Sequence, residues 1–234
     1  MRVAALIPAA GRGRRMAEEL PKAFLPMDGA PLLAHTLRKF EACSGVGEVV
    51  VLAPPGNGVQ LAEELVKRFG FAKVSRIVPG GAKRQDSVYA GLKALGPDTD
   101  LVLIHDGARP FITPDLIERM VAETRVLKAV VAAIPVRDTI KEIGEDGRVL
   151  KTLNRDRLWE IQTPQGFHYS LLLKAYEKAF QDRYYGTDDA ALVERLGIEV
   201  KVIPGSRFNL KITTPEDLVL GEAILKMKKG EMRL

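Results

Sequence analysis

The feature that most constrains the fold of this chain is its alternation of short apolar runs with longer amphipathic stretches. The apolar runs predict strands at Val3–Pro8, Glu48–Ala53, Lys73–Val78, Leu101–His105, Ala129–Pro135 and Glu199–Ile203. The amphipathic stretches predict helices at Leu32–Ala42, Val59–Phe69, Gln85–Leu95, Pro114–Leu127, Tyr169–Phe180, Asp188–Leu196 and Pro215–Lys228. Continuous apolar strands separated by helices are typical of a mostly parallel sheet with both faces covered. The sequence therefore predicts an α/β fold with a doubly wound, mostly parallel sheet.

The alternation breaks at residues 136–163, where polar and apolar residues follow one another around a turn at Glu145–Gly147. This pattern predicts a β-hairpin inserted into the α/β fold. Because an isolated hairpin buries little apolar surface, we expect an arm that packs on a second subunit and makes a homodimer. A simple edge hairpin is the alternative. We expect residues 1–234 to form one domain that carries this arm.

Composition and charge narrow the class of partner. Hydrophobic residues make up 46% of the chain and the net charge is +5, which suits a globular protein with a solvated basic surface or a preference for phosphorylated small molecules. We find no helix-turn-helix, zinc-finger or RNP-type signature, so a nucleic-acid partner is not expected. Cys43 is the single cysteine. The apolar runs are too short for a signal peptide or a membrane span, which predicts a cytoplasmic protein without membrane contact.

The segment after the first predicted strand is rich in glycine and cations. Ligands of such sheets bind beyond the carboxyl ends of the strands, here after Pro8, Val78, His105 and Pro135. Glycines let the backbone approach a ligand, and exposed N–H groups can bind an anion. The cations of this segment match a triphosphate, and a solvated basic loop is the alternative. The segment contains Gly11, Arg12, Gly13, Arg14, Arg15 and Lys22.

Two common phosphate-binding motifs do not fit this segment. A dinucleotide fingerprint needs a third glycine where Met16 stands and an acidic residue after the next strand, where Ala53-Pro54-Pro55 follows. A Walker A loop needs Gly-Lys-Ser/Thr after its spacer, which is absent. A NAD-binding dehydrogenase is therefore disfavoured. A non-enzymatic basic binding protein stays open as an alternative of a different class.

Several motifs together resemble one enzyme family. They are PAAGRGRRM, PKAFL, PGGAKRQDSV, IHDGARP, PVRDTIKE, LWEIQTPQGF, TDDA and NLKITTPEDL, between Ile7 and about Leu218. The chain resembles the 2-C-methyl-D-erythritol 4-phosphate cytidylyltransferases, which have a Rossmann-like nucleotidyltransferase sheet. Gly107 departs from the alanine usual in that family. The resemblance implies transfer of CMP from CTP to 2-C-methyl-D-erythritol 4-phosphate with magnesium, in the non-mevalonate isoprenoid pathway. A cytidylyltransferase for another polyol phosphate, such as ribitol 5-phosphate, is the alternative.

The resemblance also implies roles for particular residues. The catalytic cations are Arg15 and Lys22. The nucleotide-binding residues are Pro8, Ala9, Ala10, Gly11, Gly13, Gly80, Gly81, Arg84, Ser87 and Asp106. The acceptor-binding residues are Arg109, Thr139, Arg155, Thr163 and Lys211, and Thr139 and Arg155 are implied to reach into the site of the other subunit. The resemblance places Asp106 near the ribose and the Mg²⁺ ion.

The types and positions of Gly80, Gly81, Ser87 and Asp106 also fit these roles on physical grounds. Gly80 and Gly81 allow the main chain to approach a planar base, and Ser87 offers a hydroxyl on the first helical turn, although a plain helix start is the alternative. Asp106 follows an apolar strand, so its carboxylate should lie at the ligand edge of the sheet. Mg²⁺ commonly uses one or two carboxylates together with substrate phosphates. A turn cap is the alternative for Asp106.

Three further expectations concern neighbours of these residues. His105 is expected to be a structural neighbour rather than a catalytic base. Asp188 is expected to cap a helix. The alternation in NLKIT predicts a strand with Asn209, Lys211 and Thr213 on one face.

Overall fold

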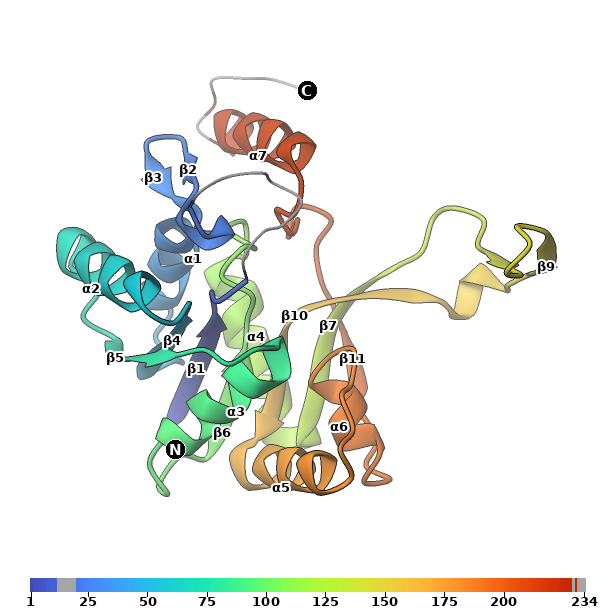
Figure 1. Cartoon of the computed structure of the whole chain (residues 1–234), viewed down its shortest axis with the longest axis horizontal. Helices are drawn as coiled ribbons and strands as arrows, with labels where there is room; N and C mark the ends of the chain where they lie inside the picture. The colour runs from blue at the N-terminus through green and yellow to red at the C-terminus, as the bar shows by residue number, and fades with distance from the viewer. Residues whose placement is uncertain (12–19, 229, 231–234) are drawn as a thin grey trace.

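The computed structural model describes residues 1–11, 20–228 and 230. Within these ranges the main sheet has seven strands in the order β11-β7-β10-β6-β1-β4-β5 (Figure 1). The strands are β1 Val3–Pro8, β4 Glu48–Ala53, β5 Val74–Pro79, β6 Leu101–Ile104, β7 Ala129–Pro135, β10 Trp159–His168 and β11 Lys201–Pro204. The pairs are parallel except those of β10, which runs antiparallel to β6 and β7. The predicted α/β fold with a mostly parallel sheet is confirmed.

Strand β1 shows why the apolar runs are continuous. Ala5 and Ile7 pack into the apolar cluster on one face of the sheet, and Ala4 and Leu6 pack into the cluster on the other face. All of these side chains are fully buried. Because successive side chains of a strand point to opposite faces, a strand covered on both sides must be apolar at every position.

Helices cover both faces of this sheet. Apolar side chains of α1 (Leu32–Glu41), α2 (Asn57–Phe69) and α4 (Pro114–Leu127) pack in the first cluster. Those of α3 (Arg84–Ala94), α5 (Tyr169–Gln181) and α6 (Ala190–Glu194) pack in the second. A further cluster joins α7 (Pro215–Lys228) to the segment with η1 (Lys22–Phe24), β2 (Pro26–Met27) and β3 (Ala30–Pro31). This last cluster holds the segment that contains Lys22 against the body of the protein.

The predicted helices and the predicted strands of the main sheet are present with small shifts at their ends. The bounds of β1, β4 and β7 agree with the prediction, whereas α6 is shorter than predicted and β11 begins at Lys201 instead of Glu199. In the ranges that the structure describes, no helix is long and apolar enough to cross a membrane.

Strand β10 was not predicted as part of the main sheet, because its first residues, 159–163, fell within the predicted hairpin. From Gln162 onwards the strand is buried between β6 and β7, although it contains the polar residues Gln162, Thr163 and Gln165. The structure satisfies these polar groups with partners from distant segments: Gln162 donates to the Ser206 carbonyl, and Gln165 donates to Asp188. Periodicity in the sequence does not reveal such long-range partners.

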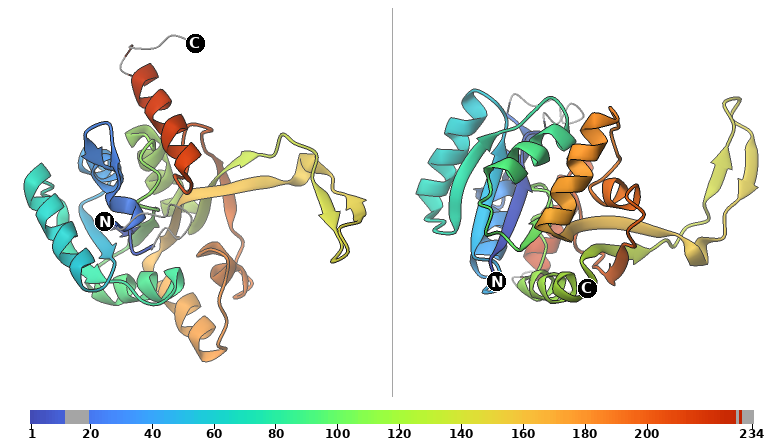
Figure 2. Two further views of the ribbon diagram at one scale, coloured as in Figure 1. Left: turned by 45° about the horizontal axis from the view of Figure 1, so that its top comes forward. Right: turned by 90° about the horizontal axis from the view of Figure 1, so that it is seen from below.

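The predicted hairpin is present but shorter than residues 136–163. Strands β8 (Lys141–Ile143) and β9 (Val149–Thr152) form an antiparallel pair, and the chain re-enters the main sheet in β10 at Trp159. The hairpin projects away from the rest of the protein in both views of Figure 2. Every residue of its two strands is exposed, including the apolar Ile143, Val149 and Leu150. The arm therefore presents apolar side chains without burying them in its own subunit.

We predict that Gly166→Ala destabilises the fold. A Cβ at Gly166 would lie 2.1 Å from Thr124 Oγ1 and 2.9 Å from Leu103 Cδ2, in the packing between β10, α4 and β6. Overpacking of this kind typically costs about 1–3 kcal/mol of unfolding free energy. Urea unfolding of the wild type and the variant measures the difference. An unfolding free energy equal to that of the wild type would contradict this view of the β10 packing.

Candidate active site

A cleft of about 720 Å³ opens beyond the carboxyl ends of β1, β4, β5 and β6. Its lining consists of Pro8, Ala9, Ala10, Gly11, Lys22, Ala23, Pro54, Pro55, Gly80, Gly81, Ala82, Lys83, Arg84, Ser87, Asp106, Ala108 and Lys211. Ligand binding was predicted from the sequence at this same edge of the sheet. All of the predicted nucleotide-binding residues that the structure describes lie in this lining, together with Lys22 and Lys211. Gly13 and Arg15 lie outside the described residues.

The glycine segment after β5 forms one wall of the cleft. The Gly80 amide donates to the Ala53 carbonyl at 2.7 Å, which continues the sheet pairing. A Cβ at Gly80 would lie 2.5 Å from the Ala10 Cβ and 2.8 Å from Ser87 Oγ, so this position requires glycine for close approach of the two loops. The Ser87 hydroxyl accepts from the Gly81 amide at 3.0 Å and donates to the Lys83 carbonyl at 3.1 Å. Ser87 thereby fixes the shape of the wall.

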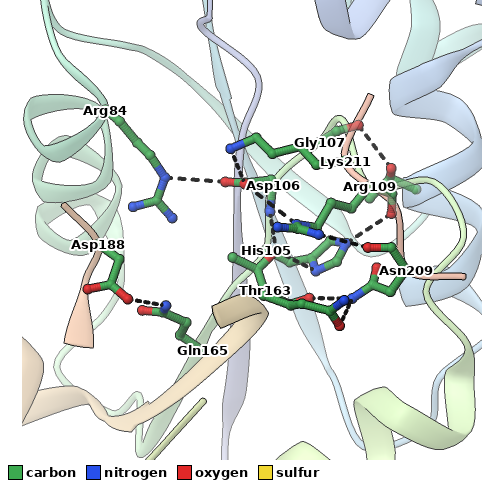
Figure 3. A network of polar contacts seen from close by, with 12 residues as sticks. Arg84, His105, Asp106, Gly107, Arg109, Thr163, Gln165, Asp188, Asn209 and Lys211 are labelled. Atoms are coloured by element: carbon green, nitrogen blue, oxygen red, sulfur yellow. Dashed lines mark hydrogen bonds and ion pairs between the residues drawn. The ribbon is translucent and has the colours of Figure 1, made fainter. Parts of the chain in front are cut away.

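The carboxylate of Asp106 lies in the cleft among cations (Figure 3). Lys211 Nζ is 2.6 Å from Oδ2, and Arg84 Nε donates to Oδ1 at 3.2 Å. Arg109 Nε is 3.8 Å from Oδ2. These cations come from segments far apart in the sequence, and Asp106 itself is only 6% exposed. The network brings together residues that the sequence assigned separately to the nucleotide and to the acceptor.

The charge state of Asp106 follows from this network. Burial alone would raise the pKa of the carboxyl, but the charges of Arg84, Lys211 and Arg109 hold that pKa well below its usual range. Asp106 is therefore ionised at neutral pH. The site combines a buried carboxylate with cations on long side chains, which suits a ligand that carries phosphates and a metal ion.

His105 and Thr163 lie behind Asp106 and hold its backbone in place. The Asp106 amide donates to Thr163 Oγ1 at 3.0 Å, and Thr163 Oγ1 lies 3.1 Å from His105 Nδ1. His105 Nε2 lies 3.1 Å from the Arg109 carbonyl. Burial lowers the pKa of His105 to about 4, so a neutral ring accepts from Thr163 and donates to that carbonyl. This arrangement fits the predicted structural role of His105.

The turn from Asp106 to Arg109 is held by several backbone contacts. Gly107 donates to the Pro8 carbonyl at 3.0 Å, and its own carbonyl accepts from Thr36 Oγ1 at 2.9 Å. A Cβ at Gly107 would lie 3.2 Å from the Pro8 carbonyl oxygen and from Leu33 Cδ1, so an alanine methyl would fit only after small shifts. The glycine that departs from the resembled family therefore leaves this turn well anchored.

The predicted acceptor residues lie in different environments. Thr139 and Arg155 are exposed on the two stems of the arm, outside the cleft lining, and Arg155 donates to the Arg137 carbonyl at 2.8 Å. Arg109 is largely buried and donates to the Asn209 carbonyl at 2.7 Å. Thr163 lies behind Asp106. Within one subunit, the structure therefore brings Lys211, Thr163 and Arg109 together and leaves Thr139 and Arg155 apart from them.

The predicted strand in NLKIT is wrong. Residues 209–213 are irregular, and the Ile212 amide makes a backbone hydrogen bond to the Ala108 carbonyl at 2.9 Å. Ile212 is fully buried in the cluster beneath α7, whereas Asn209 turns inward and donates to the Thr163 carbonyl at 2.7 Å. Lys211 still faces the cleft, because the side chains on either side of it are anchored in the core.

Sequence reasoning missed several residues of the site. Pro54, Pro55, Ala82, Lys83 and Ala108 line the cleft but were not named as site residues. Only their positions in the sequence could have indicated them, since each lies directly after a strand end or beside a residue that was predicted for the site. Asp188 has the predicted capping role: its Oδ1 accepts from the Ala191 amide at 3.0 Å.

Metal binding at this cleft needs groups beyond the protein side chains. Among the described residues, no group of three or more His, Cys, Asp or Glu side chains is placed to hold a metal ion. Asp106 offers carboxylate oxygens in the cleft, and Mg²⁺ commonly combines one or two carboxylates with substrate phosphates. The donor set therefore fits a metal ion that arrives with a phosphorylated ligand.

Comparisons with known proteins agree with this geometry. A profile described as 2-C-methyl-D-erythritol 4-phosphate cytidylyltransferase matches residues 3–227. A protein of that name from Pelotomaculum thermopropionicum is 48% identical over 99% of this chain and 97% of its own length. The one from Syntrophus aciditrophicus is 45% identical over 99% of both chains. The crystal structure of the one from Thermus thermophilus matches with a TM-score of 0.80 and 37% identity, over 97% of this chain and all of that one.

We predict that Asp106→Asn destabilises the protein near neutral pH. Removing one partner of a buried ion pair leaves the other charges uncompensated and typically costs about 3–5 kcal/mol. Because the folded-state pKa of Asp106 is lowered, its stabilisation is present above about pH 4, the unfolded pKa, and is lost as the pH falls towards the folded pKa. Urea unfolding of both proteins between about pH 3 and pH 7 should show the difference shrinking on the acid side.

Asp98→Asn is the matched control. Asp98 also pairs with an arginine, Arg2, but it lies at the surface, so its loss should change stability much less. If the difference in unfolding free energy between wild type and Asp106→Asn stays constant down to the lowest pH, the assignment of a buried charge to Asp106 is contradicted.

Proposed function

The chain belongs to the 2-C-methyl-D-erythritol 4-phosphate cytidylyltransferase family, and on that premise we propose how its residues carry the reaction. The enzyme transfers CMP from CTP to 2-C-methyl-D-erythritol 4-phosphate and releases pyrophosphate, in isoprenoid biosynthesis. A phosphate oxygen of the acceptor attacks the α-phosphorus in line. Such phosphoryl chemistry depends mainly on positioning and charge stabilisation. The convergence of Lys22, Lys83, Arg84 and Lys211 on the cleft that contains Asp106 is the observation that carries the assignment.

The nucleotide lies along the wall formed by residues 80–87. Gly80 and Gly81 leave the backbone open to a planar base, because neither carries a side chain into the cleft. Ser87 holds this wall in shape through its bonds to Gly81 and Lys83. The triphosphate extends towards Pro8–Gly11 and Lys22. Arg84 contacts the nucleotide from the same wall.

Lys22 is a catalytic cation at the α-phosphorus. It lines the cleft, and Pro21 precedes it in extended conformation at the start of η1. The neighbouring Ala23 and Phe24 are buried, so the backbone that presents the ammonium group is anchored in the core. We assign Arg15 as the second catalytic cation from its position in the same segment, together with Gly13 as a backbone contact to the phosphates.

Asp106 would hold magnesium together with the substrate phosphates. A bound magnesium ion neutralises negative charge on the phosphates and orients them. In this chain the Asp106 carboxylate is kept ionised by Arg84 and Lys211, so its oxygens would be available as metal ligands. Lys211 lies beside Asp106 in the cleft lining and is assigned to the acceptor phosphate.

The acceptor site is shared between two subunits. Lys211 lines the cleft of one subunit, where Thr163 holds the Asp106 backbone and Arg109 holds the Asn209 carbonyl. Thr139 and Arg155 lie on the arm stems, outside the cleft of their own subunit, which supports their use in the cleft of a partner. The exposed apolar residues of the arm support a homodimer: Ile143, Val149, Leu150, Trp159 and Ile161. The enzyme works in the cytoplasm on these small molecules, without nucleic acid or membrane.

We predict that Lys22→Ala lowers the rate of pyrophosphate release by about a hundredfold or more, the usual cost of losing a donor to developing charge. The assay uses each of the four ribonucleoside triphosphates with 2-C-methyl-D-erythritol 4-phosphate, and CTP should be preferred. Lys67→Ala, an exposed lysine on α2 outside the cleft lining, is the matched control and should keep the wild-type rate. Equal rates for the two variants, or a stronger reaction with ribitol 5-phosphate, would contradict the assignment.

We predict that the double variant Val149→Glu/Leu150→Glu is monomeric and has a higher KM for the acceptor. Charged residues on the arm should oppose burial of this surface between subunits. Sedimentation velocity measures the assembly, and KM for the acceptor and for CTP are measured separately. Val126→Glu, at a still more exposed apolar position on α4, is the control and should stay dimeric. A wild type that sediments as a monomer contradicts the dimer.

A further inference from the structure

A line of buried polar contacts leads from the core behind the cleft to Arg84. The Tyr176 hydroxyl, on α5, lies 2.5 Å from Asp189 Oδ1 and donates to it. Asp189 Oδ2 accepts from Arg84 Nη2 at 2.8 Å, while Arg84 Nε bonds to Asp106. Tyr176 is fully buried and Asp189 is 1% exposed. The guanidinium of Arg84 is thus held on one edge by the protein interior and on the other by the carboxylate of the site.

Helix capping does not explain the burial of Asp189. Asp188 performs that task, because its carboxylate accepts from the Ala191 amide. Its other oxygen accepts from Gln165 (Figure 3). The Asp189 side chain makes no capping hydrogen bond to α6. A buried carboxylate is costly unless it is paired and hydrogen-bonded, and Asp189 finds both conditions at Arg84 and Tyr176. Its contacts therefore point towards the cleft and not towards its own helix.

We propose that Asp189 and Tyr176 are positioning residues that fix the guanidinium of Arg84 for nucleotide binding. The inference rests on the proposed function, in which Arg84 contacts the nucleotide. Because Asp189 holds the guanidinium in the cleft before the nucleotide binds, less side-chain freedom is lost on binding.

Tyr176 keeps Asp189 oriented. Its ring is stacked on Tyr89 at 6.0 Å and packed in the apolar cluster that includes Leu172 and Ala175. Burial and the charge of Asp189 raise the pKa of the Tyr176 phenol well above its ordinary value, so the hydroxyl remains a donor across the working range of pH. Asp189 Oδ1 is thereby occupied, and Oδ2 faces Arg84.

Simple electrostatics and positioning predict opposite outcomes for Asp189→Asn. Removing a negative charge near the cleft would by itself strengthen the binding of an anionic nucleotide. If Asp189 positions Arg84, the same change releases the guanidinium to its other carboxylate partner, Asp106, and weakens nucleotide binding. The sign of the effect therefore separates the two explanations.

The experiment measures the Kd for CTP by calorimetry with magnesium present, together with kcat and the KM for CTP. Asp189→Asn should raise Kd and KM about tenfold, since hydrogen bonds to charged groups are among the stronger ones. Tyr176→Phe should act in the same direction by a smaller factor. Asp188→Asn and Tyr169→Phe are the matched controls, because they alter the neighbouring carboxylate and another tyrosine hydroxyl of α5. Both controls should keep the wild-type Kd.

A double-mutant cycle with Arg84→Ala completes the test. In the Arg84→Ala background, Asp189→Asn should produce no further rise in Kd, because the group that it positions is gone. Equal effects in both backgrounds, a lower Kd for Asp189→Asn alone, or a loss confined to kcat would overturn the inference. Should Asp189→Asn fail to fold, Tyr176→Phe carries the same cycle. Failure of the wild type to release pyrophosphate from CTP would instead overturn the proposed function itself.

Discussion

The buried carboxylate of Asp106 is the interaction on which the site depends. A carboxylate that is 6% exposed is stable as an ion only if cations and hydrogen bonds surround it. Arg84 and Lys211 each meet one of its two oxygens, and Thr163 binds the backbone beside it. Compensation of this one charge therefore involves α3, β10 and the segment before α7, all at the end of β6. The cleft opens beside this network.

The antiparallel strand β10 connects this charge network to the arm. Its buried half supplies Thr163 to the site, and its exposed half, beginning at Trp159, leads out to the hairpin. The same strand thus belongs to the core at one end and to the projecting arm at the other.

Local patterns predicted the parallel strands, the glycine wall and the place of Asp106. These features depend on residues close in sequence: an apolar run, two adjacent glycines at Gly80 and Gly81, and an acid at a strand end. Strand β10 and the irregular segment around Lys211 were not predicted, because their polar residues are satisfied by partners many positions away. The same holds for Asp189, whose contacts with Tyr176 and Arg84 leave no local signal. The family resemblance implied a role for each site residue, whereas the structure shows which other residues each of them contacts.

A crystal structure of the enzyme with CTP and magnesium tests these assignments most directly. We expect cytosine against the wall of residues 80–87, and phosphates between Lys22 and Asp106. We also expect Asp106 to contact the metal ion while Arg84 remains bonded to Asp189. A nucleotide bound on another surface, or phosphates directed away from Lys22 and Asp106, would contradict these assignments.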